Sequence, residues 1–110
     1  GDADNVSLSS AELHSGKGLL VIRSGSQSGN RYVVEALTSI GRHPESAICL
    51  DDVTVSRRHA EVVLDNGRYI VRDLGSLNGT YVNQMRIDEL ALEQGDELQI
   101  GKYRMVFFNG

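Results

Sequence analysis

Residues 59–73 read His-Ala-Glu-Val-Val-Leu-Asp-Asn-Gly-Arg-Tyr-Ile-Val-Arg-Asp, and this stretch decides the fold class. Apolar and polar side chains alternate on both sides of Asn66 and Gly67, as they do along strands that bury one face. An Asn-Gly pair readily adopts the positive φ angles of a tight hairpin turn. The stretch therefore predicts a β-hairpin with strands at residues 59–64 and 68–73.

Similar short apolar runs, bounded by glycine or asparagine, occur along the rest of the chain. They predict further strands at residues 19–22, 31–36, 39–42, 48–50, 80–83, 97–100 and 102–108. No pattern of helical length competes with them. About ten short strands with frequent turns are typical of an antiparallel sandwich or barrel, so the sequence predicts an all-β fold.

The length and the cysteine content limit the organisation of the protein. The chain has 110 residues, which suits one domain. We expect a flexible, serine-rich tail over residues 1–18 and the domain over residues 19–110. Cys49 is the one cysteine, which excludes an internal disulfide and suits a reducing compartment. The sequence contains neither a long apolar run nor a secretion signal, so we expect a cytoplasmic protein without membrane contact.

The overall charge argues against binding of polyanions over the whole surface. The chain has 15 acidic and 11 basic residues, for a net charge of -4 at neutral pH. We therefore expect no nucleic acid partner, because such partners need an excess of basic surface. Any anion has to be bound at a local group of basic side chains.

Three loops carry polar residues that alternation and turn chemistry do not explain, and they span residues 41–44, 51–59 and 75–80. Guanidinium groups can hold an oxyanion with paired hydrogen bonds, and the first two loops contain Arg42, Arg57 and Arg58. Ser56 adds a hydroxyl donor. A phosphorylated side chain carries about -1.5 to -2 charge, which one or two arginines and a hydroxyl match. The loops predict a phosphate pocket, although surface arginines in loops are often simply solvated.

The order of these motifs resembles the forkhead-associated (FHA) domain, a reader of phosphothreonine peptides. The motifs are Gly41-Arg42, then Ser56-Arg57-Arg58-His59, then residues 73–80, and the likeness spans residues 19–109. The resemblance implies an FHA-like β-sandwich of about eleven mostly antiparallel strands, with the binding site in loops at one end. This agrees with the strand pattern found independently above.

The resemblance also implies a role for each matching residue. Residues implied to bind the phosphothreonine peptide are Arg42, Ser56, Arg57, Ser76 and Asn78. Among them, Arg42 and Ser56 would hold the phosphate and Asn78 the peptide backbone. The residue three places after the phosphothreonine would be selected by Thr54 and Leu77. Residues implied to support the site are Gly41, His59, Gly79 and Thr80.

Within this family, the motifs look closest to small actinobacterial regulators of 2-oxoglutarate and glutamate metabolism. Those proteins are switched when a serine/threonine kinase phosphorylates a threonine in their own N-terminal tail. Residues 1–18 contain four serines and no threonine, so these residues do not predict such self-inhibition. A second departure is Ala47, where those relatives tend to carry aspartate.

Two functions follow from the resemblance. The first is a phosphothreonine-peptide-binding module in serine/threonine-kinase signalling, whose partners are phosphorylated proteins, a kinase or metabolic enzymes. The second is a regulator that binds metabolic enzymes through the same loops without needing phosphate on them. Both make the protein a binding module without a cofactor.

Enzymatic and metal-binding functions are not favoured. Ser56, His59 and Asp52 include the residue types of a catalytic triad, but no Gly-x-Ser-x-Gly pattern surrounds the serine. His14 and His43 lie in the tail and in a turn, so paired ligand spacing for a metal is missing. We therefore expect neither a catalytic residue nor a metal site.

Overall fold

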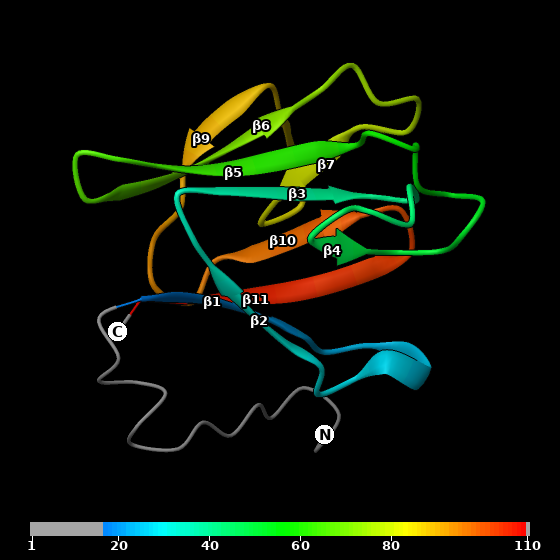
Figure 1. Ribbon diagram of the computed structural model, residues 1–110, viewed down its shortest axis with the longest axis horizontal. Coiled ribbons are helices and arrows are strands. Elements are labelled where there is room, and N and C mark those ends of the chain that lie inside the picture. The colour runs from blue at the N-terminus through cyan, green and yellow to red at the C-terminus, as the bar shows by residue number, and fades with distance from the viewer. Residues whose placement is uncertain (1–16, 110) are drawn as a thin grey trace.

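The computed structural model describes residues 17–109, and Figure 1 shows them as two facing β-sheets. Along the described chain the elements are β1 (Gly18–Ile22), the 3-10 helix η2 (Gly25–Gln27), β2 (Arg31–Val34), β3 (Leu37–Gly41), β4 (Ile48–Cys49), β5 (Ala60–Asp65), β6 (Arg68–Asp73), β7 (Thr80–Val82), β8 (Met85–Ile87), β9 (Glu89–Ala91), β10 (Glu97–Ile100) and β11 (Tyr103–Asn109). The tail predicted for residues 1–18 lies outside the described residues except for Lys17 and Gly18, and Gly18 already belongs to β1.

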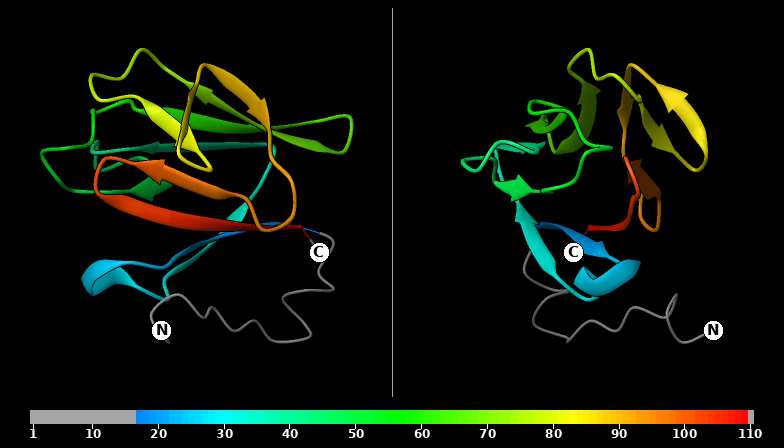
Figure 2. Two further views of the ribbon diagram at one scale, coloured as in Figure 1. Left: turned by 180° about the vertical axis from the view of Figure 1, so that it is seen from behind. Right: turned by 90° about the vertical axis from the view of Figure 1, so that its right-hand side faces the viewer.

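The two sheets form a sandwich. One sheet has six strands in the order β2-β1-β11-β10-β7-β8, and the other has five in the order β4-β3-β5-β6-β9. Every pairing is antiparallel except that of β3 with β4. The prediction of an all-β sandwich of about eleven mostly antiparallel strands is confirmed, and Figure 2 shows the two layers from the side.

The predicted hairpin is present as β5 and β6. Their register runs from Ala60 opposite Asp73 to Asp65 opposite Arg68. The turn between them has positive φ at Asn66 and Gly67, as the Asn-Gly pair predicted. Local sequence alone therefore specifies this part of the fold.

Two strands were not predicted, namely β8 and β9. Each has three residues, and the side chains of both are mostly exposed, so neither shows an apolar run. A turn with positive φ at Asn83 and Gln84 joins β7 to β8. Pairing of β8 with β7 and of β9 with β6 holds these two strands in place, and that information is absent from their own residues.

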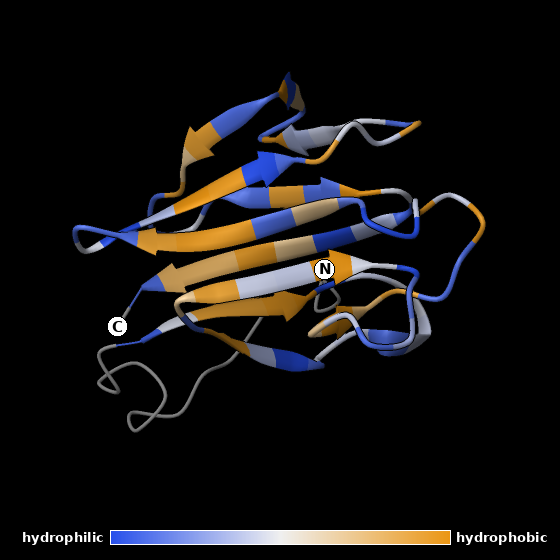
Figure 3. Ribbon diagram, turned by 45° about the horizontal axis from the view of Figure 1, so that its top comes forward, coloured by the Kyte–Doolittle hydropathy of each residue, from blue (hydrophilic) through white to orange (hydrophobic). Residues whose placement is uncertain are grey.

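The core lies between the sheets and is apolar. Fully buried side chains from both layers meet there, including Leu20 and Phe107 from one sheet and Ile40 and Val62 from the other. In Figure 3 the hydrophobic colour is concentrated on the strands. The loops that follow β3, β4 and β6 lie together at the right-hand end in Figure 1, and the hairpin turn of β5 and β6 lies at the opposite end.

Candidate functional site

The loops after β3 and β4 run side by side without space for a side chain at residue 41. The amide of Arg42 donates to the carbonyl of Ser56 (3.0 Å), and the amide of His43 donates to the carbonyl of Arg57 (3.1 Å). A Cβ atom at Gly41 would lie 2.1 Å from the carbonyl oxygen of Arg57. Glycine is therefore needed here for close backbone approach, since the two loops could not otherwise lie so close together.

The Arg42 side chain lies against the second loop. Its Nε donates to the carbonyl of Val55 (3.1 Å), and the side chain is half-buried. Within the described chain, its two terminal nitrogens have no hydrogen-bond partner and no carboxylate. This geometry fixes the guanidinium plane and leaves its outer edge available to an anion.

His59 joins the second loop, the third loop and β3 from a fully buried position. Its Nδ1 accepts from the amide of Ser56 (3.1 Å), so Nε2 carries the ring hydrogen and donates to the carbonyl of Gly79 (2.8 Å). Its own amide donates to Ile40, and its carbonyl accepts from Leu74. Because both ring nitrogens are used, the ring sets the spacing between the loop carrying Ser56 and the loop carrying Asn78.

The Ser56 hydroxyl faces the third loop. Its Oγ accepts from the amide of Leu77 (3.1 Å), while the Leu77 side chain is 85% exposed. A hydroxyl that accepts through oxygen can still donate its hydrogen elsewhere. Ser56 therefore joins the second and third loops and can donate to a bound oxyanion.

Asn78 makes a second link between the same loops. Its Nδ2 donates to the carbonyl of Thr54 (2.9 Å), and the side chain is exposed. The side-chain oxygen of Asn78 has no partner among residues 17–109. The amide group is therefore held at its nitrogen and can accept at its oxygen.

Thr54 is held by a small network with Asp52 and Lys102. Both the amide and the hydroxyl of Thr54 donate to the Asp52 carboxylate, and the hydroxyl accepts from the amide of Lys102 (3.0 Å). The Lys102 ammonium lies 3.0 Å from the same carboxylate. The Thr54 hydrogen bonds, followed by the contact with Lys102, lower the pKa of Asp52 to about 2. The pKa of Lys102 is raised by its hydrogen bond to Asp52.

Asp73, at the end of β6, organises the third loop. Its carboxylate accepts from the hydroxyls of Ser76 and Thr80 and from the amides of Gly75 and Ser76. Burial raises the pKa of Asp73, but these hydrogen bonds outweigh it and leave the pKa below its usual value. Sequence reasoning gave this residue no role, although an aspartate two residues before glycine in a turn is a known signal for such loop contacts.

Ser76, which the resemblance implied to bind the phosphothreonine peptide, lies inside the third loop. It is buried, its hydroxyl donates to Asp73, and its Oγ accepts from the amide of Gly79 (3.0 Å). Both functions of the hydroxyl are thus used inside the loop. Ser76 shapes the loop that presents Asn78.

A further residue missed by sequence reasoning is Arg86 of β8. Gly79 has a φ of +88°, and a Cβ atom there would lie 2.9 Å from the Arg86 Nε. The guanidinium group therefore packs on the Asn78 loop from a neighbouring strand. No local motif surrounds Arg86, and only the register of the unpredicted strand β8 brings it to the site.

The site as a whole brings Arg42, Ser56 and Asn78 to one short segment, residues 54–57. Arg57 and Arg58 are exposed on the same loop, and neither side chain has a carboxylate partner within the part of the chain that the structure describes. Arg42 and Arg57, together with the Ser56 hydroxyl, offer donors suited to an anion. Arg58 instead lines a separate hollow with His43, Glu45 and Glu61.

Comparison with known proteins agrees with this geometry. The family profile of the FHA domain matches residues 38–101, which include all three loops. The chain belongs to the FHA family. The predicted resemblance is thereby confirmed at the level of the family.

The chain is similar to curated actinobacterial proteins. It is 56% identical over 99 residues to the glycogen accumulation regulator GarA of Mycobacterium tuberculosis, covering 89% of this chain and 61% of that protein. It is 50% identical over 106 residues to the oxoglutarate dehydrogenase inhibitor of Corynebacterium glutamicum, covering 96% of this chain and 74% of that protein. The chain thus spans about three fifths of the length of the first of these relatives.

Solved FHA structures are similar in fold. One, from a study of phosphothreonine-dependent FHA domain interactions, has a TM-score of 0.79 at 33% identity and covers 86% of this chain and 97% of that chain. Another is Mycobacterium tuberculosis EmbR in complex with a low-affinity phosphopeptide, with a TM-score of 0.80 at 33% identity, covering 86% of this chain and 25% of that chain.

Within residues 17–109 there is no group of three potential metal ligands close enough to hold an ion. No helix in that range is long and apolar enough to cross a membrane.

Proposed function

We propose that this protein is a phosphothreonine-peptide-binding module that acts in serine/threonine-kinase signalling. The observation that carries the proposal is the convergence of Arg42, Ser56 and Asn78 on residues 54–57, where the Arg42 and Arg57 guanidinium groups lack carboxylate partners among the described residues. Membership of the FHA family and similarity to the EmbR phosphopeptide complex support it.

In this proposal the phosphate lies between the outer edge of the Arg42 guanidinium group and the Ser56 hydroxyl. Arg57 adds a second positive charge from the exposed side of the loop, and the Asn78 side-chain oxygen accepts from the peptide backbone. Leu77 and Thr54 contact residues after the phosphothreonine. Ser76, whose hydroxyl is used by Asp73 and Gly79, contributes by holding the loop rather than by touching phosphate.

Four residues support the site, each in a different way. Gly41 allows the first two loops to approach, and His59 spaces the second and third loops. Gly79 supplies the positive φ of the Asn78 loop, and Thr80 donates to Asp73. All four act through the position of Ser56 or Asn78.

Calorimetric titration with a phosphothreonine peptide and its unphosphorylated form tests the proposal. We expect binding of the phosphorylated form only, and at least a tenfold loss of affinity for Arg42→Ala, because hydrogen bonds to charged groups are worth about 1.5 to 3 kcal/mol each. Arg68→Ala is the matched control, since Arg68 is an exposed arginine of β6 at the opposite end. Equal binding of both peptides would contradict the proposal.

A second candidate function is regulation of metabolic enzymes through the same loops without phosphate on the partner. It is supported by the names of the relatives, which describe a regulator of glycogen accumulation and an inhibitor of oxoglutarate dehydrogenase. Capture of an unphosphorylated enzyme of this class, with capture lost in Ser56→Ala, would favour this function. In either case the protein acts as a cytoplasmic, non-enzymatic module, with residues 19–110 as the FHA domain and residues 1–18 as its tail.

A further inference from the structure

A groove lies directly beside Asn78. It has a volume of roughly 450 Å³ and is lined by Thr54, Asn78, Tyr81, Gln84, Gln99, Gly101 and Lys102. Thr54 and Asn78 belong to the proposed phosphopeptide site, so the groove continues from that site onto the six-stranded sheet. Its walls combine amide, hydroxyl and ammonium groups with a similar share of apolar surface, so they can hydrogen-bond a polar occupant.

The groove opens onto a basic row that crosses the outer face of this sheet. Gln99 stands opposite Tyr81 on one side and opposite Arg104 on the other, and Tyr81 stands opposite Arg86. Residues directly opposite one another in a sheet share a face. Arg86, Tyr81, Gln99 and Arg104 therefore form the basic row, and both of its arginines are exposed.

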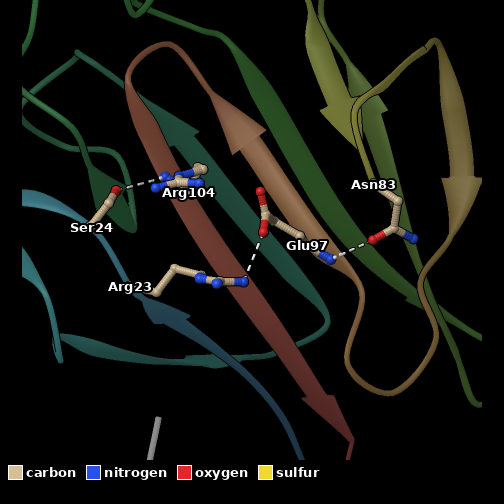
Figure 4. Close-up of polar contacts among 5 residues, drawn as sticks. All are labelled: Arg23, Ser24, Asn83, Glu97 and Arg104. Atoms are coloured by element: carbon tan, nitrogen blue, oxygen red, sulfur yellow. Dashed lines mark hydrogen bonds and ion pairs between the residues drawn. The ribbon is translucent and has the colours of Figure 1, made fainter. Parts of the chain in front are cut away.

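The one carboxylate in the strands of this sheet and the Asp52 carboxylate beside the groove are already engaged. Glu97 is the one acidic residue in the strands of this sheet, and Figure 4 shows Arg23 reaching across β11 to it, at 2.8 Å. Asp52, beside the groove, is paired with Lys102. Arg86 and Arg104 have no ion pair within residues 17–109. Their charge is thus available to a partner.

The outer charge of the two sheets differs in sign. The strands of the six-stranded sheet contain three arginines and one glutamate, whereas those of the five-stranded sheet contain two arginines and four acidic residues. In a chain of net charge -4, this concentrates positive potential on the face that adjoins the phosphate site. An acidic ligand is drawn to this face and repelled from the other.

We propose that the basic row is a second contact surface for an acidic segment that adjoins the phosphothreonine in the bound protein. This inference rests on the proposed function and names a feature of its partners. Adjacent strands lie about 4.8 Å apart, so the four strands of the basic row span roughly 14 Å, the length of about four extended residues. The occupant is a phosphothreonine segment with two or more aspartates or glutamates within about five residues.

Titration of three otherwise identical phosphothreonine peptides tests this. One carries glutamates on the N-terminal side, one carries them on the C-terminal side, and one carries glutamines throughout. We expect one acidic peptide to bind about tenfold more tightly than the glutamine peptide at low salt, about threefold for each of two exposed charge pairs. The advantage should fall towards unity at high ionic strength, where exposed charges are screened.

Three variants locate the effect. Arg104→Gln should remove about threefold of the advantage and leave the affinity for the glutamine peptide unchanged. Arg68→Gln, on the five-stranded sheet, is the matched control and should change neither. Arg86→Lys keeps the charge while testing the packing on Gly79, so it should retain the advantage.

The outcomes separate the two proposals. If no phosphopeptide binds, the proposed function itself fails. The inference is overturned if the glutamine peptide and both acidic peptides bind the protein with the same affinity. It is also overturned if Arg104→Gln and Arg68→Gln have the same effect on the affinity for the acidic peptide, because the basic row is then not a peptide surface. The inference is also overturned if anionic lipid vesicles or RNA bind through Arg104 and abolish the difference in affinity between the acidic and the glutamine peptides.

Discussion

The two ends of the sandwich use the same residue type for different purposes. At the hairpin end, Gly67 has a φ of +77°, and a Cβ atom there would meet nothing within 4 Å. At the loop end, Gly41 has no positive φ, yet a Cβ atom would lie 2.1 Å from a carbonyl oxygen. The first glycine serves a local turn, and the second serves a tertiary contact. The structure at the hairpin end is thus determined by residues close together in the sequence, whereas the site depends on contacts between segments far apart in it.

The largest expected effect is that of His59→Ala. The substitution leaves a cavity and removes the partners of the Ser56 amide and the Gly79 carbonyl, so we expect a loss of roughly 3 to 5 kcal/mol in the free energy of unfolding. Urea denaturation measures it. His43→Ala, a half-buried histidine outside the core, serves as the control and should cost much less. Similar losses for both would show that His59 does not join the loops.

Gly41→Ala should have the next largest effect. The added methyl group forces the Arg57 carbonyl away, which costs about 1 to 3 kcal/mol of stability. It also displaces Arg42 relative to Ser56, so affinity for a phosphothreonine peptide should fall at least tenfold. Calorimetric titration at a temperature where the variant remains folded separates the two effects. Unchanged affinity would mean that the spacing of the first two loops does not control the site.

Acid should weaken the loop end before the hairpin end. The folded-state pKa of Asp52 is about 2, below its ordinary value of 3.8, and the pKa of Asp73 is also lowered. A depressed carboxylate pKa stabilises the fold above the unfolded-state pKa, and this stabilisation is lost as the pH falls from about 4 towards 2. Melting temperatures measured across this interval should decline, and the decline should be smaller in Asp52→Asn.

Asp65→Asn is the control for this pH dependence, because Asp65 lies in the hairpin and its carboxylate makes no hydrogen bond or ion pair in the described part of the chain. It should keep the full decline of the unsubstituted protein. If the decline in melting temperature is reduced equally in Asp52→Asn and Asp65→Asn, the network of Asp52, Thr54 and Lys102 is not the source of the acid sensitivity.

The same division explains what the sequence could predict. The alternation in residues 59–73 predicted β5 and β6 correctly because a strand's pattern and its turn are encoded locally. The sequence could not predict β8 or β9, because each has only three residues and is held by pairing with a neighbouring strand. Short elements of this kind take their structure from neighbours.

The candidate site shows the same limit. Motif order indicated Arg42, Ser56 and Asn78, and the structure places Arg42 and Asn78 against the segment that carries Ser56. Asp73 was overlooked because an aspartate at a strand end is common, and Arg86 because only strand register brings it to Gly79. The partners of Ser76 also depend on the folded loop, so its surroundings could not be found from its position in a motif.

The smallest expected effect is that of Gly67→Ala. An L-residue with a side chain pays about 1 to 2 kcal/mol to adopt a left-handed backbone conformation, and no neighbour is displaced because nothing lies near the added methyl group. Stability should fall by that amount while affinity for a phosphothreonine peptide stays unchanged. The pair Gly41→Ala and Gly67→Ala, measured by denaturation and by titration, thus separates a glycine needed for space from one needed for a turn. A loss of peptide affinity in Gly67→Ala would show that the hairpin end is coupled to the site through the sheet, and the contrast between the two ends would then not hold.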